Sequence, residues 1–451
     1  MSTTAGAPDL SGQRLPGWSA VILILVVGVL GGGGSSARPL FEALCHLGGF
    51  LVLAVLVVTG RDVRIDPSAR AWLGLAIAAF ALPLVQLLPL PGALSAGLPG
   101  RELATAIRAE VGATGPWPIS LDPDRTVIAA LSLVPGIAMF AATLRCGEQW
   151  RRRFIFAWIA VALVSVMVGA LQVASSGSAA QIYDTLHRDA AIGFFANRNH
   201  QSVFLLSVLL MFVAALVLGT QSRTRPAMLL RAGLVILLVA GLFITRSRAG
   251  LLLLVIAVPA LILFAGRGRL AWRPSWPVTA AAFAILAAVG AFIAFNPVAR
   301  AVLSRFSSLD DSRLIYWPDV VYTLGQVWPV GSGFGTFQAL FATQERIGTI
   351  DEFYLNHAHN EYLELAIEGG IVAVLLIAVF LVMLALRIRA VSDWNGDARR
   401  LAVAGAIAIC AVLLHSLVDY PLRAITMTAM FGFSAGLLFR PAARLSDAEP
   451  S

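Results

Sequence analysis

Twelve apolar blocks recur along this chain of 451 residues, and nearly all are long enough to cross a lipid bilayer. A helix needs about 20 predominantly apolar residues to span the hydrocarbon core. Such a repeat predicts an all-α polytopic membrane protein with about 12 transmembrane helices, in which residues 1–451 form a single integral membrane domain. The blocks are 19–33, 42–59, 71–90, 126–144, 153–174, 201–219, 227–244, 249–265, 277–295, 362–386, 400–418 and 423–439.

The composition excludes a soluble protein. Hydrophobic residues make up 58% of the chain and charged residues 13%, whereas soluble domains contain roughly a quarter charged residues. No polar segment is long enough for a nucleic-acid-binding module, so nucleic acid is not an expected partner. Cys45, Cys146 and Cys410 lie in or beside apolar blocks and form neither a metal-ligand spacing nor a disulfide framework.

Arginine distribution predicts the orientation. The formal charge of +8 comes from arginine, because the chain contains no lysine. Intervals on the side of the termini hold 20 arginines and eight acidic residues, and the opposite intervals hold 13 and 17. The positive-inside rule therefore places both termini in the cytoplasm. Ser35-Ser36-Ala37 after the first block imitates a signal-peptide cleavage site, but the many later blocks favour an uncleaved helix.

Three polar intervals face outward in this topology: 91–125, 174–200 and 297–361. The last lies between the ninth and tenth blocks and is too long for a simple connector, so we expect short helices within it. One is expected to begin at Arg313. The glycine-rich segment 331–335 predicts a tight turn, because glycine permits positive φ; a phosphate-binding loop is the alternative.

The richest cluster of polar groups joins this outer interval to the tenth block. It reads Asn356-His357-Ala358-His359-Asn360-Glu361. If Asn360 caps the following helix, three glutamates share one face of its first two turns. Carboxylates at that depth require an aqueous cavity or a partner. The three are Glu361, Glu364 and Glu368.

His359 is the candidate general base of this cluster. The positive end of the helix dipole disfavours the imidazolium form, and a general base must be neutral. The alternative is a histidine that only caps the helix or lies in the headgroup layer. His357 could join it in a metal pair with Asp351 or Glu352, but no well-spaced third ligand is evident, so no metal is expected.

Arginines on the outer side are candidate phosphate ligands. Arg246 and Arg248 occupy a short gap between two blocks, against the positive-inside tendency. Guanidinium groups bind phosphate bidentately, although an ion pair with the glutamates of the tenth block or snorkelling to the headgroups is also consistent with the pattern. Arg198 and Arg313 are further candidates.

The connector between the last two blocks contains Asp419, Pro421 and Arg423. Pro421 fits the start or break of a helix, and Asp419 can pair with Arg423. We expect a structural latch here rather than a catalytic group.

In this order the motifs resemble the O-antigen ligase and O-antigen polymerase superfamily of bacterial inner-membrane proteins, over roughly residues 190–425. The ligase signature resembles His-Asn, nine residues, then Gly-x-x-Gly; His359-Asn360 and Gly370 match it, whereas Ala373 occupies the last position. The other segments that carry the resemblance are 193–199, 247–250, 313–317, 331–337, 357–362 and 415–421.

The resemblance implies a GT-C-like architecture with 297–361 as a large periplasmic loop. It also implies a metal-independent, inverting glycosyltransferase without a cofactor, whose donor is an undecaprenyl-pyrophosphate-linked glycan and whose acceptor is a glycan or lipid A core. The essential histidine of the family falls on His359. The arginines that hold pyrophosphate fall among Arg198, Arg246, Arg248 and Arg313.

These observations define one predicted mechanism. Arginines stabilise the leaving pyrophosphate, while His359 takes the proton of an acceptor hydroxyl that attacks the anomeric carbon. His357, Asn360 and Glu364 bind substrate or orient His359. An O-antigen or exopolysaccharide repeat-unit polymerase of the same superfamily remains open. A transporter or flippase is the alternative from another class of protein. The polar groups of transporters usually line a path near the midplane of the membrane, whereas in this chain they gather at one face.

Overall fold

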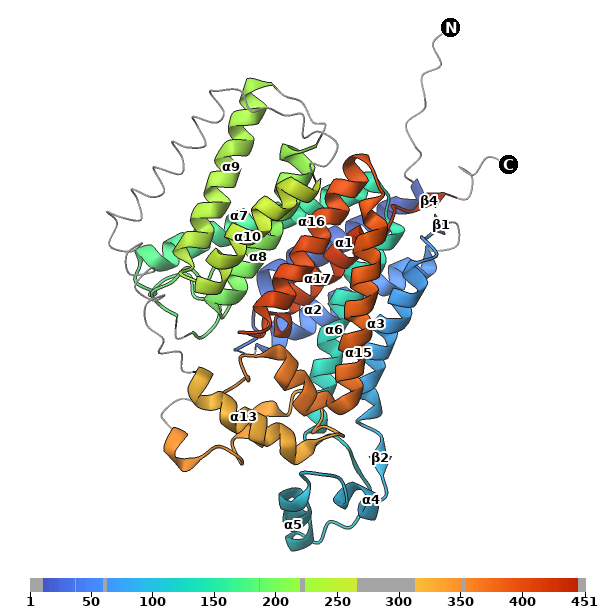
Figure 1. Ribbon diagram of the computed structural model, residues 1–451, viewed down its shortest axis with the longest axis vertical. Coiled ribbons are helices and arrows are strands. Elements are labelled where there is room, and N and C mark those ends of the chain that lie inside the picture. The colour runs from blue at the N-terminus through green and yellow to red at the C-terminus, as the bar shows by residue number, and fades with distance from the viewer. Residues whose placement is uncertain are drawn as a thin grey trace.

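The computed structural model describes residues 11–36, 38–59, 63–185, 187–219, 224–265, 313–350 and 354–444. Its helices form a long bundle with a smaller helical layer at one end (Figure 1). Within the described ranges, nine helices are long and apolar enough to cross a membrane. They are α1 (Ser11–Leu30), α2 (Pro39–Val58), α6 (Pro123–Arg145), α7 (Glu148–Ala174), α8 (Arg198–Phe212) with its continuation η2 (Val213–Val217), α9 (Arg225–Ile244), α10 (Arg248–Ala265), α15 (Glu361–Ser392) and α16 (Gly396–His415).

Two shorter apolar helices, α3 (Ala69–Val85) and α17 (Ile425–Leu437), account for two further predicted blocks. Both are shorter than the blocks 71–90 and 423–439, because prolines flank them: Pro89 follows α3, and Pro421 opens the 3-10 turn η4 (Pro421–Arg423) before α17. The predicted ninth block, 277–295, lies outside the described residues. The prediction of an all-α polytopic membrane protein is confirmed.

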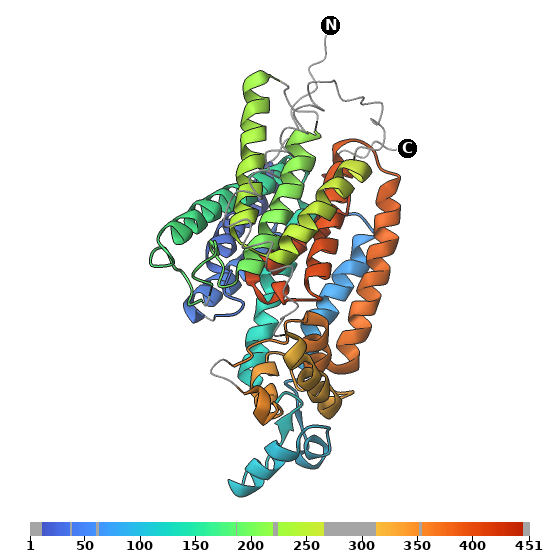
Figure 2. The ribbon, with the colours of Figure 1, turned by 60° about the vertical axis from the view of Figure 1, so that its left-hand side comes forward.

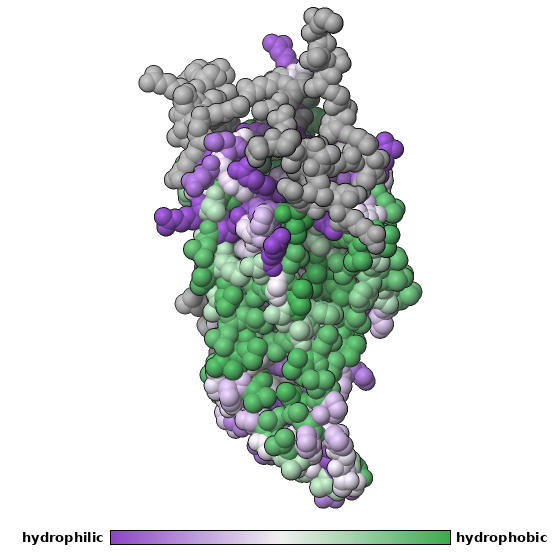
Figure 3. Space-filling view, turned by 90° about the vertical axis from the view of Figure 1, so that its right-hand side faces the viewer, coloured by the Kyte–Doolittle hydropathy of each residue, from purple (hydrophilic) through white to green (hydrophobic). Residues whose placement is uncertain are grey.

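The surface of the bundle has the polarity of a membrane protein. Apolar residues form a broad zone around its middle, and hydrophilic residues lie toward both ends (Figure 3). Large apolar side chains in this zone face outward, among them Val57, Met167 and Leu229, which are 79%, 62% and 74% exposed. Lipid is the solvent that such a surface requires.

Glycines allow two core helices to pack backbone against backbone. A Cβ atom on Gly432 of α17 would lie 2.1 Å from the carbonyl oxygen of Gly136 in α6. Small residues at such crossings permit the close approach that drives helix association in membranes. This contact fixes α17, and therefore the turn before it, against α6.

The two ends of the bundle carry different structure. β1 (Val63–Arg64) pairs with β4 (Ala443–Arg444) at one end, and the helical layer lies at the other (Figure 1). The described part of 297–361 contains helices, as predicted; one of them includes Arg313, the first residue described in this interval. The layer comprises α4 (Gly92–Ala96), α5 (Glu102–Glu110), the paired strands β2 (Pro89–Leu90) and β3 (Trp117–Pro118), α13 (Arg313–Val327), α14 (Phe337–Phe341) and η3 (Ile347–Thr349).

The glycine-rich segment forms the predicted tight turn and docks on the start of α15. Gly331, Gly333 and Gly335 have φ values of 87°, 104° and 80°. The amide of Gly333 donates to the carbonyl oxygen of Glu368 at 3.0 Å. α15 itself is kinked at Gly370 (φ 60°, ψ −153°), where a Cβ would lie 2.2 Å from the carbonyl oxygen of Pro329. Only glycine tolerates this conformation without strain.

Candidate functional site

A cavity of about 1800 Å³ runs from the bundle into the helical layer. The part of the cavity within the bundle is apolar and is lined by α3, α6, α15 and α17. Figure 2 shows α3 and α15 side by side. Trp72, Leu133, Ile377 and Phe431 are typical of this part. The other end is polar and contains histidines, glutamates and arginines. The cavity therefore joins an apolar channel to a charged site.

The segment 356–360 forms one edge of the polar end. The Asn360 side chain accepts hydrogen bonds from the amides of Tyr362 and Leu363, which confirms it as the cap of α15. The His357 imidazole is held from both sides: Nδ1 lies 2.6 Å from Glu364 Oε1, and Nε2 lies 3.1 Å from the carbonyl oxygen of Gly34. The segment is thus fixed to the connector after α1 as well as to α15.

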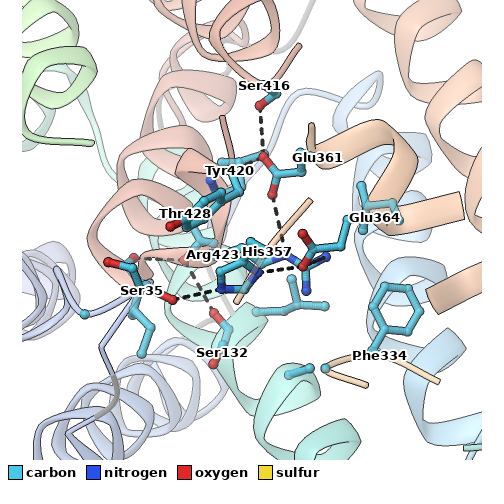
Figure 4. Close-up of a pocket in the computed structure, with 18 of the residues that line it drawn as sticks. Ser35, Ser132, Phe334, His357, Glu361, Glu364, Ser416, Tyr420, Arg423 and Thr428 are labelled. Carbon is cyan, nitrogen blue, oxygen red and sulfur yellow. Dashed lines mark hydrogen bonds and ion pairs between the residues drawn. The ribbon is translucent and has the colours of Figure 1, made fainter. Parts of the chain in front are cut away.

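The three glutamates of α15 surround one guanidinium, that of Arg423. Figure 4 shows two of them, Glu361 and Glu364, beside Arg423. Arg423 Nη2 lies 2.8 Å from Glu368 Oε2 and 3.2 Å from Glu364 Oε1, and Nε lies 3.9 Å from Glu361 Oε1. The predicted common face of these glutamates is confirmed. Arg423, expected to pair with Asp419, instead pairs with the glutamates, because η4 turns it toward the start of α15.

Each carboxylate also accepts a hydrogen bond from another group. Ser416 Oγ donates to Glu361 at 2.9 Å, and the amide of Ala358 donates to Glu364 at 2.8 Å. The amide of Gly335, in the glycine-rich turn, donates to Glu368 at 2.9 Å. The turn therefore binds a carboxylate of the protein itself. Buried carboxylates bound in this way hold other groups in place and are not free bases.

His359 lies against Asp419 at the cavity wall. Its Nδ1 is buried, 3.7 Å from Asp419 Oδ1, while 27% of its side chain remains exposed. Its φ of 49° is in the left-handed region, which histidine and asparagine enter more readily than most residues. With Nδ1 directed at a carboxylate, Nε2 is the nitrogen available to a substrate. This arrangement suits a general base.

Asp419 is fully buried and is bound from several sides. Asn199 Nδ2 donates to Oδ2 at 2.5 Å, and the Tyr420 amide donates to Oδ1 at 2.9 Å. Burial alone would raise the pKa of the carboxyl, but the imidazoles of His200 and His359 hold the pKa of Asp419 well below its usual range. Asp419 is therefore an anion beside His359, a role that the sequence analysis did not assign to it.

Tyr420 fills the space between three histidines. Its ring centroid lies 4.2 Å from that of His357 and 5.0 Å from those of His200 and His359. The side chain is 2% exposed. A rigid ring at this position keeps the imidazole of His359 from rotating into the protein.

Of the predicted arginines whose side chains are described, Arg198, Arg246 and Arg248 do not line the cavity. Arg246 Nη1 lies 2.9 Å from Asp189 Oδ2, and Arg248 begins α10. Arg198 begins α8, close enough to His187 for its charge to act on that imidazole. Arg313 is the first described residue of α13, and its side chain lies outside the described part of the chain.

Among the described residues, three other arginines line the cavity: Arg125, Arg188 and Arg423. Arg125 lies in the first turn of α6, and Arg188 lies in the loop that precedes α8. Both are exposed. In the sequence, the one indication that these two arginines could bind a ligand is that each lies in an outer polar interval. Neither belongs to a motif.

His187 lines the cavity next to Arg188. Burial lowers the pKa of the His187 imidazole to about 4, and the charge of Arg198 adds to this effect. The ordinary histidine value is about 6.5. The unfolded chain therefore binds a proton between pH 6.5 and 4 that the folded chain does not.

Replacing His187 with glutamine is expected to reduce the acid sensitivity of the fold. In the native protein the free energy of unfolding should fall by up to about 3 kcal/mol as the pH drops from 6.5 to 4. Glutamine removes the titrating group and keeps hydrogen-bonding capacity. Thermal unfolding of both proteins in detergent, measured at several pH values, checks this. The prediction would be contradicted if the unfolding temperatures of the two proteins fell equally as the pH is lowered.

In the described residues, no group of three or more His, Cys, Asp or Glu side chains is arranged to hold a metal ion. Asp351 and Glu352, considered as ligands beside the histidines, lie outside the described residues.

Fold and site together define a multi-pass membrane protein whose charged site is reached through an apolar cavity. Residues 232–378, from α9 into α15, match the family model described as O-antigen ligase. This match agrees with the resemblance to the O-antigen ligase and polymerase superfamily that the motifs predicted. The match covers ligases and polymerases alike. Comparison with curated proteins gives no match.

Proposed function

We propose that this protein transfers a glycan from an undecaprenyl-pyrophosphate-linked donor to a sugar hydroxyl of an acceptor, such as a glycan or lipid A core. The observation that carries the proposal is the continuity of the cavity. Its apolar length along α3, α6, α15 and α17 suits a polyprenyl chain, and its polar end offers an imidazole and guanidinium groups. A lipid-linked sugar has the same division between an apolar chain and a charged head.

The pyrophosphate is expected at Arg188 and Arg125. Both guanidinium groups are exposed on the cavity wall, and arginine remains charged in a partly dry site. Arg423 is less suited, because three carboxylates surround its single positive charge. Arg198 and Arg246 interact with the two sequence neighbours of Arg188. The charge of Arg198 lowers the pKa of His187, and Arg246 pairs with Asp189.

The transfer is a single displacement. His359 Nε2 accepts the proton of the acceptor hydroxyl as its oxygen attacks the anomeric carbon, and the bond to the pyrophosphate oxygen breaks. The lipid pyrophosphate leaves with the electron pair, stabilised by the arginines. Attack opposite the leaving group inverts the anomeric centre. Asp419 orients His359. Asn360 caps α15 and so fixes the backbone beside His359, and Glu364 holds the neighbouring His357.

The polar end is proposed to face the periplasm of a bacterial inner membrane. The bias of arginine toward the opposite side supports this orientation, with both termini in the cytoplasm. Lipid-linked glycans and their acceptors then meet at the outer leaflet, where the cavity opens into the helical layer.

The test is transfer by the purified protein in proteoliposomes. With a lipid-linked oligosaccharide from the producing cell and its acceptor glycan, we expect a longer glycan and released undecaprenyl pyrophosphate. Movement of intact lipid-linked glycan across the bilayer without bond cleavage would instead indicate a flippase.

Deletion in the cell separates the two reactions of the superfamily. Loss of glycan from lipid A core, with lipid-linked polymer intact, indicates a ligase. Collapse of a ladder of lipid-linked glycans to single repeat units indicates a polymerase.

A further inference from the structure

A second, smaller cavity of about 320 Å³ opens beside the polar end of the large one. It lies between the first turn of α6, the glycine-rich turn and α14, and we call it the side chamber. Five residues line both cavities, so the two are continuous. The shared residues are Arg125, Gly335, Gln338, Tyr354 and Leu355.

The walls of the side chamber have a distinct composition. Small residues, such as Ala339 and Ala342, form part of its lining, and Asp122, Gln338 and Glu345 add polar groups. Tyr354 contributes an aromatic ring, and this residue is 74% exposed. Its two acidic groups outnumber its single arginine, which makes it unsuited to a second phosphate.

These groups are those that bind sugars. Planar carboxylate and amide groups pair with vicinal hydroxyls, because each presents two hydrogen-bonding atoms side by side. An aromatic ring packs against the apolar face of a pyranose. A volume of about 320 Å³ is at the small end of ligand sites, the size of one or two sugar rings.

The side chamber is also close enough to the reacting groups. Tyr354 precedes His359 by five residues, and five residues of fully extended chain span at most about 18 Å. A short oligosaccharide covers such a distance. A sugar held at Tyr354 can therefore belong to a glycan whose reacting end lies at His359.

We infer that the side chamber is a saccharide subsite that binds neutral or amino sugars of one of the two glycans, a few rings from the reacting centre. This inference rests on the proposed glycan transfer. The chemistry is the same for the donor glycan and the acceptor glycan, and the experiment below separates these sources.

The experiment measures binding rather than transfer. The full chain carrying His359→Asn, which removes the proposed base, is titrated in nanodiscs with two delipidated probes from the producing cell. One is the oligosaccharide of the lipid-linked donor, and the other is the acceptor oligosaccharide. Adding Gln338→Ala or Tyr354→Ala should weaken binding of one probe at least tenfold, while Tyr354→Phe, which keeps the ring, should retain most of it.

Gln344→Ala is the matched control, because Gln344 follows the same short helix but does not line the side chamber. The probe whose affinity falls identifies the source of the bound sugar. Binding that is unchanged in both side-chamber variants, or absent for both probes, overturns the inference. Neither result affects the proposed transfer, which is measured separately on the protein with His359 intact.

Discussion

Replacing His359 with asparagine is expected to lower the rate of glycan transfer by about 10²- to 10⁴-fold, the usual contribution of a general base. Asparagine removes the imidazole but, like histidine, tolerates the positive φ of 49° at this position. The fold should therefore survive, so the loss should appear in kcat with the protein still present in the membrane. Initial rates in proteoliposomes, together with protein abundance, check this.

Asp419→Asn tests the partner of His359. An amide keeps the shape but not the charge that faces Nδ1 at 3.7 Å, so transfer should fall by about 10²-fold. Because the pKa of Asp419 is held below its usual range, its carboxyl stays ionised until the pH falls below that depressed value. The contribution of Asp419 should then be constant between pH 5 and 8.

Full transfer by His359→Asn would remove His359 from the reaction and leave the cavity without its proposed base. Equal losses in His359→Asn and in a variant of His187, a cavity histidine next to Arg188, would indicate general damage to the site. His187→Gln is the suitable comparison, since no part of the proposed proton transfer uses it.

The parts of the site that the sequence predicts correctly are local. Asn360 followed by an apolar run predicts a helix start, and the spacing of Glu361, Glu364 and Glu368 then fixes their shared face. Both follow from the geometry of one helix. The apolar blocks are equally local, because the bilayer sets their length.

The partners across the bundle are not local, and there the predictions differ from the structure. Asp419 and Arg423 are four residues apart and were expected to pair. Because the turn η4 lies between them, Asp419 instead lies beside His359, and Arg423 pairs with Glu368 of α15. An ion pair between Arg246 and the glutamates of α15 was one of the expectations, but Arg246 pairs with Asp189. Spacing along the chain does not determine which helices meet, since that depends on packing such as the glycine contact of α6 with α17.

Arg423→Met is expected to destabilise the whole protein rather than slow transfer alone. Three carboxylates that are at most 5% exposed would lose the guanidinium that holds them together. Removing one partner of a buried ion pair costs about 3–5 kcal/mol, because the remaining charge stays desolvated. We expect little folded protein in the membrane, measured by abundance and by thermal unfolding in detergent.

Matched substitutions separate charge from packing at this position. Arg246→Met removes an arginine from a more exposed pair with Asp189 and should cost no more than about 1 kcal/mol. Adding Glu361→Gln and Glu368→Gln to Arg423→Met should restore much of the folded protein, since the uncompensated charge is then largely gone. Glu364 keeps His357 as its partner at 2.6 Å, so it need not be changed. Normal abundance and unfolding temperature for Arg423→Met alone would mean that these glutamates are neutral in the folded protein, and that the guanidinium is not what holds the start of α15 in place.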